Sequence, residues 1–274
     1  MTIPRRPTIG VFDSGFGGLT VLKELIKLIP AADYLYFGDT ARLPYGSKSA
    51  ETVARYAVEA TQFLESQGAQ FHVIACNTAT ALALDRITQA ARVPVVGVVE
   101  PGAERASRET RKKRVVVIGT DATVTSHAYR KALETRGVEA REKACPLFVP
   151  LVEEGWVDHP VTEQVARIYL QEAFADGFHD ADVLVLGCTH YPLIHPLLRR
   201  VAPAGVKIVD SAHSTANAVC DEIQRLEPAG PESERRGLTR TRFFATDSVE
   251  KFRRLGPKFL GHAVDDVQHV DLKE

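Results

Sequence analysis

Runs of apolar, mostly β-branched residues recur along this chain, and two of the fully apolar runs are followed within two residues by a cysteine. These two runs are Val73–Ala75 and Val183–Leu186. A strand that is apolar on both faces is buried on both faces, as in a parallel sheet that helices cover from both sides. Because helix-like stretches follow most of the runs, the chain is predicted to have an α/β fold with mainly parallel sheets.

Strands and helices are expected to alternate as far as position 210, and one more strand follows near the end. The expected strands are Thr8–Phe12, Tyr34–Gly38, Phe71–Ala75, Val93–Val99, Arg114–Gly119, Ala144–Phe148, Asp182–Gly187, Val206–Asp210 and Phe243–Ala245. The expected helices are Leu19–Leu28, Ala50–Gln67, Thr78–Ala91, Ser126–Thr135, His159–Phe174 and Pro192–Val201, with a helix and a crossover within Arg105–Arg114. Thr246–Ser248 is expected to cap a last helix, and Glu227–Arg240 is predicted to be an exposed loop.

The second half of the chain repeats the pattern of the first half. Asp13, at the end of the first strand, precedes Cys76 by 63 residues, and Thr120, after the strand that restarts the pattern, precedes Cys188 by 68. We therefore expect two pseudo-symmetric α/β domains. The active site is expected in the cleft between them, because clefts between domains are common ligand sites.

The composition argues against several classes of protein. The chain has 34 lysines and arginines against 35 acidic residues, so it lacks the basic excess of a general nucleic-acid binder. It has no run of about 18 apolar residues that would predict a membrane span, and its first residues do not resemble a secretory signal. The 4 cysteines lack the close spacing of a disulfide framework or a metal motif. We expect a cytoplasmic protein with reduced thiols, and with no metal, nucleic-acid or membrane partner.

Two of the cysteines follow expected buried strands. Cys76 directly follows the run Val73–Ala75, and Cys188 follows the run Val183–Leu186 after one glycine. Ligands bind at the carboxyl ends of strands in open α/β sheets, and the N-terminus of the next helix is expected to lower the pKa of each thiol. A free cysteine is more often inert packing, and this interpretation suits Cys145 and Cys220. For Cys76 and Cys188 an acid/base role on one small substrate is favoured.

A glycine-rich loop, Asp13–Gly18, joins the first expected strand to the first expected helix. The loop does not fit the dinucleotide-binding fingerprint, because Thr20 stands where a further glycine is needed. Asp13 suits the ammonium group of a small ligand, while Ser14 and helix-terminal N–H groups suit a carboxylate. The alternative is a tight turn that needs glycine for its backbone conformation alone.

Polar side chains also follow the other strand ends. His190 lies two positions after Cys188 and is a candidate to hold or move a proton; a hydrogen-bonded structural histidine is the alternative. Thr120 and Thr123 follow the strand Arg114–Gly119 and are candidates to bind a carboxylate. Ordinary capping of the next helix is the alternative for these threonines.

Several short motifs follow one another in a fixed order between Thr8 and about Ser214, and one more lies near the end. The motifs are Phe12–Leu19, Gly38–Gly46, Ala75–Thr80, Gly97–Gly102, Gly119–Val124, Phe148–Gly155, Gly187–Pro192 and Phe244–Asp247. Together they resemble the glutamate racemase family of amino-acid racemases. One such motif would be weak, but the ordered set is specific.

The resemblance implies two facing α/β domains, one formed by residues 1–98 and 211–274 and the other by the inserted residues 99–210. It implies an isomerase that interconverts L- and D-glutamate without a cofactor and supplies D-glutamate for peptidoglycan synthesis, and so for cell-wall biogenesis and cell shape. Cys188 would take the α-proton from L-glutamate and Cys76 the one from D-glutamate. The resemblance leaves a homodimer open.

The resemblance also assigns roles to other residues of this chain. The residues that would support the thiols are Asp13, Asp39, Glu153 and His190. The residues that would bind the substrate are Asp13, Ser14, Tyr45, Gly46, Asn77, Thr78, Thr120, Thr123, Thr189 and His190. It implies no metal site.

Three other functions compete with this one. A racemase of the same superfamily that acts on aspartate, a hydantoin or a related acid would share the motifs, and the size of the pocket near Tyr45 and Thr189 would distinguish it. A two-lobed amino-acid-binding protein would not need paired thiols. A thiol hydrolase or transferase would need one cysteine and a base, so its second cysteine would be superfluous.

Overall fold

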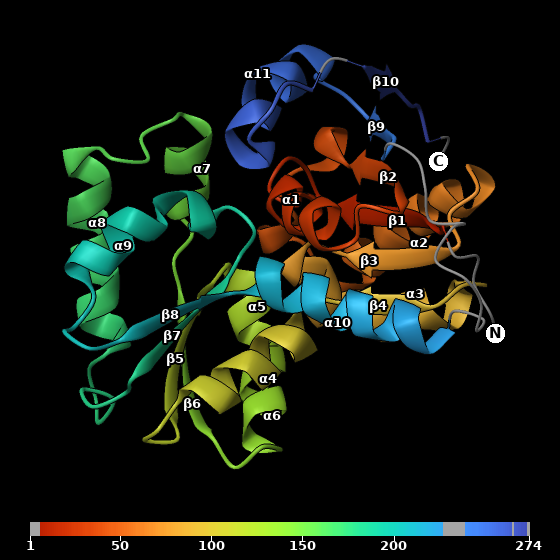
Figure 1. Ribbon diagram of the computed structural model, residues 1–274. Coiled ribbons are helices and arrows are strands. Elements are labelled where there is room, and N and C mark those ends of the chain that lie inside the picture. Colours follow the sequence, from red (N-terminus) through yellow and green to blue (C-terminus); the bar gives the residue numbers. More distant parts are fainter. Residues whose placement is uncertain (1–5, 227–238, 265, 273–274) are drawn as a thin grey trace.

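The computed structural model describes residues 6–226, 239–264 and 266–272, and its strands form two sheets (Figure 1). Neighbouring strands run parallel in both sheets. Helices cover the sheets, so the predicted α/β class is confirmed. We call the part built on the six-stranded sheet the larger domain and the part built on the four-stranded sheet the smaller domain.

The larger sheet has the strand order β10-β9-β2-β1-β3-β4. Its strands are β1 (Thr8–Asp13), β2 (Asp33–Gly38), β3 (Phe71–Ile74), β4 (Val95–Gly97), β9 (Thr241–Ala245) and β10 (Val267–His269). β1 and β3 lie inside the sheet and are buried over almost their whole length, which explains why their sequences are mostly apolar. The pairing of β9 with β2 returns the end of the chain to this sheet.

The smaller sheet has the strand order β6-β5-β7-β8. Its strands are β5 (Arg114–Gly119), β6 (Glu139–Ala144), β7 (Val183–Gly187) and β8 (Lys207–Asp210). The two inner strands, β5 and β7, are the buried ones.

One strand arrangement occurs twice in the molecule. The first four strands of the chain lie side by side in the order β2-β1-β3-β4, and the next four lie in the order β6-β5-β7-β8. In both sets the second strand of the set lies at one end, followed by the first, the third and the fourth. Cys76 follows the third strand of the first set, and Cys188 follows the third strand of the second set. The expected pseudo-symmetry is therefore confirmed, and it places the two thiols at equivalent strand ends.

The helices alternate with the strands along the chain. They are α1 (Leu19–Leu28), α2 (Ala50–Ser66), α3 (Asn77–Ala90), α4 (Val99–Glu109), α5 (Asp121–Ser126), α6 (Ala128–Glu134), α7 (Phe148–Glu153), α8 (Pro160–Ala173), α9 (His195–Val201), α10 (Ser211–Leu226) and α11 (Val249–Leu260). The described residues also form short 3₁₀ turns, which are η1 (Thr40–Arg42), η2 (Tyr45–Ser47) and η3 (Tyr191–Ile194). Within the described ranges, no helix combines the length and the apolar character that crossing a membrane requires.

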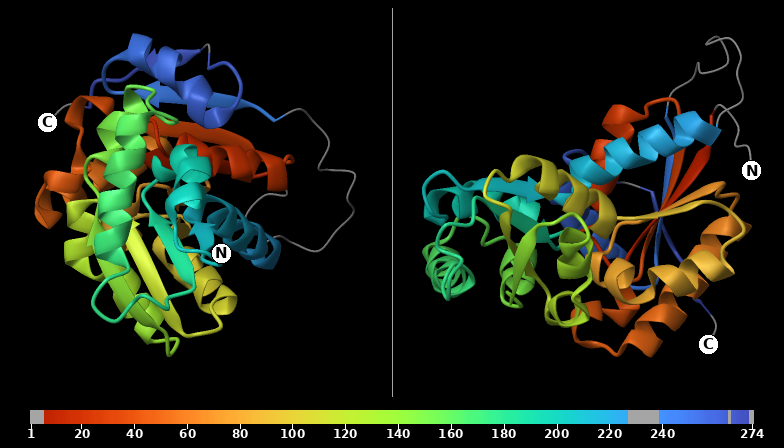
Figure 2. Two further views of the ribbon diagram at one scale, coloured as in Figure 1. Left: turned by 90° about the vertical axis from the view of Figure 1, so that its left-hand side faces the viewer. Right: turned by 90° about the horizontal axis from the view of Figure 1, so that it is seen from below.

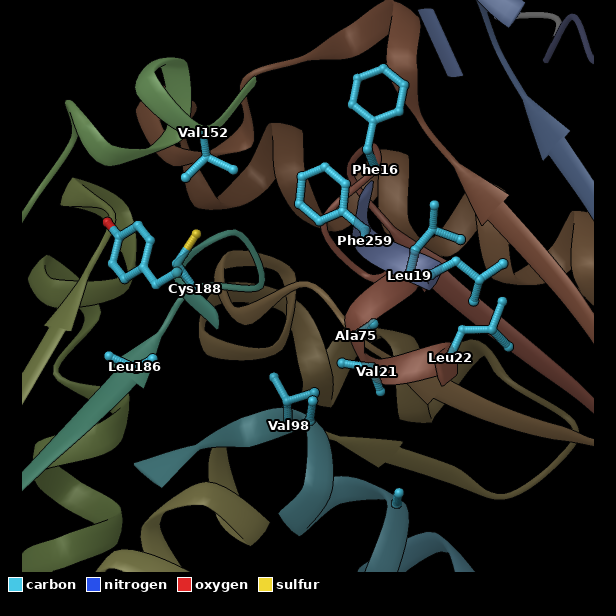
Figure 3. Close-up of a cluster of buried hydrophobic side chains, with 14 of the residues drawn as sticks. Phe16, Leu19, Val21, Leu22, Ala75, Val98, Val152, Leu186, Cys188 and Phe259 are labelled. Atoms are coloured by element: carbon cyan, nitrogen blue, oxygen red, sulfur yellow. The ribbon is translucent and has the colours of Figure 1, made fainter. Parts of the chain in front are cut away.

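The hydrophobic core runs without interruption from one domain into the other. One face of the larger sheet packs with α2 and α3, and the opposite face packs with α1, α10 and α11. This second cluster continues to the face of the smaller sheet that α7, α8 and α9 cover. Figure 3 shows part of it, with Phe16 and Leu19 on the larger domain and Leu186 and Cys188 on the smaller one. The domains are therefore joined by buried apolar contact as well as by the chain, and the right-hand view of Figure 2 shows them side by side.

Two expected strands differ from the observed ones. The sequence predicts a strand at Ala144–Phe148, but β6 is Glu139–Ala144 and Phe148 begins α7. β6 lies at the edge of its sheet and is only partly buried, so its charged sequence lacks the apolar run of an inner strand. The prediction for Val93–Val99 was too long, because β4 has only three residues and α4 already begins at Val99.

Several helix predictions also need correction. Ser126–Thr135 is not one helix, because His127 has a left-handed backbone (φ 57°) between α5 and α6. Pro192–Val201 begins as the 3₁₀ turn η3 and becomes helical only at His195. Arg105 lies inside α4, which leaves a short connection after Glu109. Among the described residues, no side chain forms a capping hydrogen bond at Ser248, the N-cap position of α11. Most of the loop predicted at Glu227–Arg240 lies outside the described residues.

Candidate active site

The ends of β1, β3, β5 and β7 meet where the two domains face each other. A pocket of about 50 Å³ lies there, and both strand-end thiols line it. Its lining residues are Ser14, Leu43, Pro44, Tyr45, Gly46, Cys76, Asn77, Thr78, Thr120, Val149, Gly187, Cys188, Thr189 and His190. A larger hollow of about 690 Å³ lies beside α4, α9 and β8, but its lining includes neither thiol.

Cys76 is the N-cap residue of α3. The backbone N–H of Ala79 donates to its Sγ at 3.4 Å, and the thiol lies 3.4 Å from the Ser14 hydroxyl oxygen, to which it donates. Burial nevertheless raises the pKa of Cys76 to about 12, and the charge of nearby Asp13 acts in the same direction. The expected lowering by the helix N-terminus is therefore wrong for this thiol, because desolvation of a thiolate outweighs one N–H donor.

Asp13 lies behind Cys76 and does not line the pocket. Its side chain is fully buried, and its Oδ2 accepts a 2.9 Å hydrogen bond from the N–H of Gly15. Burial raises the pKa of Asp13, while the positive charge of His190 acts against that rise. A buried carboxyl group with a raised pKa is suited to exchanging a proton with a neighbour.

Cys188 begins a chain of polar contacts that leads away from the pocket. Its Sγ lies 4.0 Å from Nδ1 of His190, and Nε2 of the same ring lies 3.2 Å from Oε1 of Glu153. Oε2 of Glu153 accepts a 2.8 Å hydrogen bond from Nζ of Lys251. Cys188 is followed by a turn and by η3, so the α-helix expected directly after it is displaced to His195.

His190 is buried and forms an ion pair with the partly buried Glu153. Burial acts to lower the pKa of His190, but its hydrogen bonds to Cys188 and Glu153 raise that pKa to about 10. Burial acts to raise the pKa of Glu153, but hydrogen bonds from His190 and Lys251 lower it to about 2. At neutral pH His190 is therefore an imidazolium and Glu153 is a carboxylate.

This pair predicts a pH-dependent contribution to stability. Because the pKa of His190 rises on folding from 6.5 to about 10, its contribution is complete below pH 6.5 and is lost as the pH rises through about 10. Because the pKa of Glu153 falls on folding from 4.5 to about 2, its contribution is complete above pH 4.5 and is lost as the pH falls toward 2. Glu153→Gln is expected to lower the free energy of unfolding by about 2 kcal/mol near pH 6.

The difference between wild type and Glu153→Gln should then shrink between pH 6.5 and pH 10. Urea unfolding at several pH values measures it, and Glu154→Gln is the matched control because Glu154 is the exposed neighbour. A difference that stays constant up to pH 10 would show that the imidazolium does not stabilise the fold.

Two glycines allow the domains to approach each other closely at the pocket. A Cβ on Gly17 would lie 2.2 Å from Oγ1 of Thr189 and 2.6 Å from Nδ1 of His190. A Cβ on Gly46 would lie 2.9 Å from Cβ of Thr120. The glycines at these positions therefore serve close contact between the two domains.

Three threonine hydroxyls meet across the domain boundary. Thr78 Oγ1 lies 2.9 Å from Thr120 Oγ1 and 3.2 Å from Thr123 Oγ1, and the last two lie 3.0 Å apart. Thr120 also caps α5, since its hydroxyl accepts from the N–H of Thr123. Thr120 therefore both caps α5 and belongs to the threonine cluster. Thr123 itself is buried behind the pocket lining.

Asp39 holds a wall of the pocket in place. It accepts hydrogen bonds from the hydroxyl of Tyr45, from Nε of Arg42 at 2.8 Å and from Thr246 at 2.9 Å. Among the described residues it has no hydrogen bond to either thiol. Its contact to the site therefore passes through Tyr45.

Asn77 brings a free donor to the pocket. Its Oδ1 accepts a 2.7 Å hydrogen bond from the hydroxyl of Tyr129, whereas its buried Nδ2 has no hydrogen-bond partner among the described residues. An unpaired buried amide is costly, so a ligand acceptor at this position would be stabilised.

Comparison with known proteins identifies the family. The model of the Asp/Glu/Hydantoin racemase family matches residues 9–219. The glutamate racemase of Koribacter versatilis is 60% identical to this chain, with 98% of each sequence covered. The chain belongs to the glutamate racemase family. It is therefore a racemase, an enzyme of the isomerase class.

Solved glutamate racemases share the whole fold. The Thermus thermophilus glutamate racemase, solved with β-chloro-D-alanine, superimposes with a TM-score of 0.85 at 46% identity and 98% coverage of both chains. The Francisella tularensis glutamate racemase, solved with D-glutamate, gives a TM-score of 0.86 at 35% identity, with 97% of this chain and 98% of that chain covered.

The structure brings most of the predicted site residues of this racemase to one place. Those that line the pocket are Ser14, Tyr45, Gly46, Cys76, Asn77, Thr78, Thr120, Cys188, Thr189 and His190. Those that lie behind the lining are Asp13, Asp39, Thr123 and Glu153, each in contact with a lining residue or with its loop.

Sequence reasoning missed several residues of the site. Leu43, Pro44, Val149 and Gly187 line the pocket, and all four lie inside motifs that carried the resemblance. Tyr129 and Lys251 contact site residues from outside those motifs, and their sequence neighbourhoods carry no signal of this role. No cluster of metal-ligating side chains occurs in the part of the chain that the structure describes.

Proposed function

We propose that this enzyme interconverts L- and D-glutamate, with Cys76 and Cys188 acting as acid and base on opposite faces of the α carbon. The observation that carries the proposal is that both thiols, from equivalent strand ends of two matching sheets, line one small pocket. The substrate is inferred from the names of the relatives. Curated glutamate racemases are 60% and 49% identical to this chain, and the Francisella tularensis structure is a complex with D-glutamate.

The proposed reaction needs one thiolate and one thiol. In the direction from L-glutamate, Cys188 takes the α-proton and Cys76 returns a proton to the opposite face, so that the centre inverts. The pKa of Cys76 near 12 keeps this residue protonated and ready to donate, and the His190 imidazolium faces the sulfur of Cys188. From D-glutamate the roles are exchanged, with Asp13 placed to help Cys76.

Acid–base transfer is only part of the rate enhancement. It typically gives 10²–10⁴-fold, and an α-proton is a much weaker acid than a thiol. The remainder must come from excluded water and from donors aimed at the charge that develops on the substrate carboxylate. We propose the hydroxyls of Ser14, Thr78, Thr120 and Thr189, together with Nδ2 of Asn77, as these donors. Asp39 would act by holding Tyr45, and Glu153 by holding His190.

We propose that the described conformation is the closed one. About 50 Å³ holds a few water molecules, whereas glutamate has ten non-hydrogen atoms. We propose that the two domains separate to admit the substrate, and that closure then excludes water. We further propose that the domains divide as residues 1–98 with 211–274 and residues 99–210. We also propose that the enzyme works in the cytoplasm to supply D-glutamate for peptidoglycan.

Chiral analysis of the purified protein tests the proposal. Incubation with either glutamate enantiomer, without any added cofactor, should give a mixture that approaches equal amounts of both. Aspartate and a hydantoin, assayed in parallel, should be turned over far more slowly. Binding of glutamate without turnover would favour a binding protein, and faster turnover of aspartate would reassign the substrate.

A further inference from the structure

The carboxylate of Glu153 contacts two cations that come from different parts of the molecule. Its Oε1 lies 3.2 Å from Nε2 of His190, and its Oε2 lies 2.8 Å from Nζ of Lys251. Glu153 is the last residue of α7, His190 follows β7, and Lys251 lies in the first turn of α11. Both oxygens are thus occupied, and the orientation of the carboxylate is set from two sides.

The contact to Lys251 crosses the domain boundary. α11 connects β9 and β10, so it belongs to the larger sheet, whereas α7 connects strands of the smaller sheet. Nζ of Lys251 also lies 5.4 Å from the centre of the Phe16 ring, which attracts and positions the ammonium group. In Figure 1, α7 and α11 lie on the same side of the molecule and approach each other across the gap between the sheets.

The position of His190 depends on this carboxylate. Glu153 holds Nε2, and the same ring places Nδ1 near Cys188 at 4.0 Å. The Phe259 ring of α11 packs edge-on against the imidazole at 5.3 Å. The larger domain therefore contacts His190 and Glu153 through two residues of α11, which are Phe259 and Lys251.

We infer that Lys251 is a positioning residue that completes the Cys188 half of the site when the two domains close. Closure brings the ammonium group to Glu153, which fixes the carboxylate on His190 and the imidazolium on Cys188. Separation of the domains removes the ammonium group and leaves Glu153 free to turn away. The reactive arrangement at Cys188 then exists only in the closed enzyme. This inference rests on the proposed function.

The effect of Lys251 on the rate should be larger than its effect on stability. Its side chain is 38% exposed and that of Glu153 is 15% exposed, and partly exposed ion pairs contribute little to folding. Catalysis, by contrast, responds to small displacements of a reacting group. Lys251→Met should therefore fold normally and lose activity.

The test compares Lys251→Met and Lys251→Arg with Lys258→Met. Lys258 lies on the same helix and reaches the end of α7, since a Cβ on Gly155 would lie 2.9 Å from its Nζ, but it forms no described ion pair with Glu153. We expect kcat/KM to fall about tenfold in Lys251→Met. The fall should be equal for both enantiomers, because the ratio of their kcat/KM values equals the equilibrium constant of racemisation, which is one. Lys251→Arg should recover most of the loss, and Lys258→Met should resemble wild type.

Primary deuterium isotope effects on kcat/KM, measured with each 2-deuterated enantiomer, separate positioning from a general defect. Slower transfer at Cys188 makes that step more rate-limiting, so in Lys251→Met the effect should rise for L-glutamate and fall toward one for D-glutamate. Unchanged isotope effects, or the same changes in Lys258→Met, would overturn the inference. Wild type that does not racemise glutamate would instead overturn the proposed function.

Discussion

Replacing Cys76 by serine is expected to abolish racemisation, with kcat/KM falling at least about a thousandfold for both enantiomers. A serine hydroxyl is a far weaker acid than a thiol, so it cannot return a proton to the intermediate that Cys188 generates. The exchange is nearly isosteric, and the N–H of Ala79, which donates to Sγ at 3.4 Å, can donate to a hydroxyl oxygen. The fold should therefore be preserved.

The variant should keep one half of the reaction. In D₂O over long incubation, Cys188 in Cys76→Ser is expected to exchange the α-hydrogen of L-glutamate slowly, without inversion, and to leave D-glutamate unlabelled. Cys220→Ser is the control, because Cys220 lies in α10 and does not line the pocket; it should racemise normally. Near-normal racemisation by Cys76→Ser would remove Cys76 from the mechanism.

Replacing Cys188 by serine is expected to cause a loss of the same size with the opposite exchange pattern. The remaining thiol, Cys76, faces the other side of the α carbon, so D-glutamate should exchange slowly in D₂O and L-glutamate should not. The imidazolium of His190 then lies beside a neutral hydroxyl instead of the sulfur it contacts at 4.0 Å.

The two cysteine variants act as controls for each other. Both carry the same chemical change at equivalent strand ends, so a non-specific defect would affect exchange of both enantiomers equally in each variant. If one variant lost activity while the other kept it, a single-nucleophile hydrolase or transferase would be favoured. If the exchange patterns were swapped between the variants, the assignment of each thiol to one enantiomer would be wrong.

The inner strands and the thiols were predictable because burial leaves a direct mark on sequence. β1, β3, β5 and β7 are buried on both faces, so their apolar runs could be recognised and their carboxyl ends located. Since the carboxyl ends of parallel strands collect at one edge, Cys76 and Cys188 could be expected at ligand-binding positions.

The features that were missed depend on contacts between distant segments. β6 is an edge strand of charged residues, Glu139–Ala144, and only its pairing with β5 shows that it is a strand. Lys251 reaches Glu153 across 98 positions of sequence, and a lysine on an amphipathic helix gives no sign of such a contact.

The pKa of Cys76 was mispredicted for a related reason. Its position at the N-terminus of α3 was recognised, but the degree of burial that raises its pKa to about 12 is a property of the assembled domains. Local sequence shows the helix end, whereas desolvation depends on what the rest of the chain places around it.

Racemisation by the wild-type enzyme in D₂O, stopped after a few per cent of turnover, tests directly whether two separate groups serve the two faces of the α carbon. Starting from either enantiomer, the new enantiomer should carry one deuterium on that carbon, because its hydrogen comes from a group equilibrated with solvent, and the unreacted substrate should retain protium. A product that kept the hydrogen of its substrate would show that one group moves it from face to face, and the two-thiol account would be contradicted.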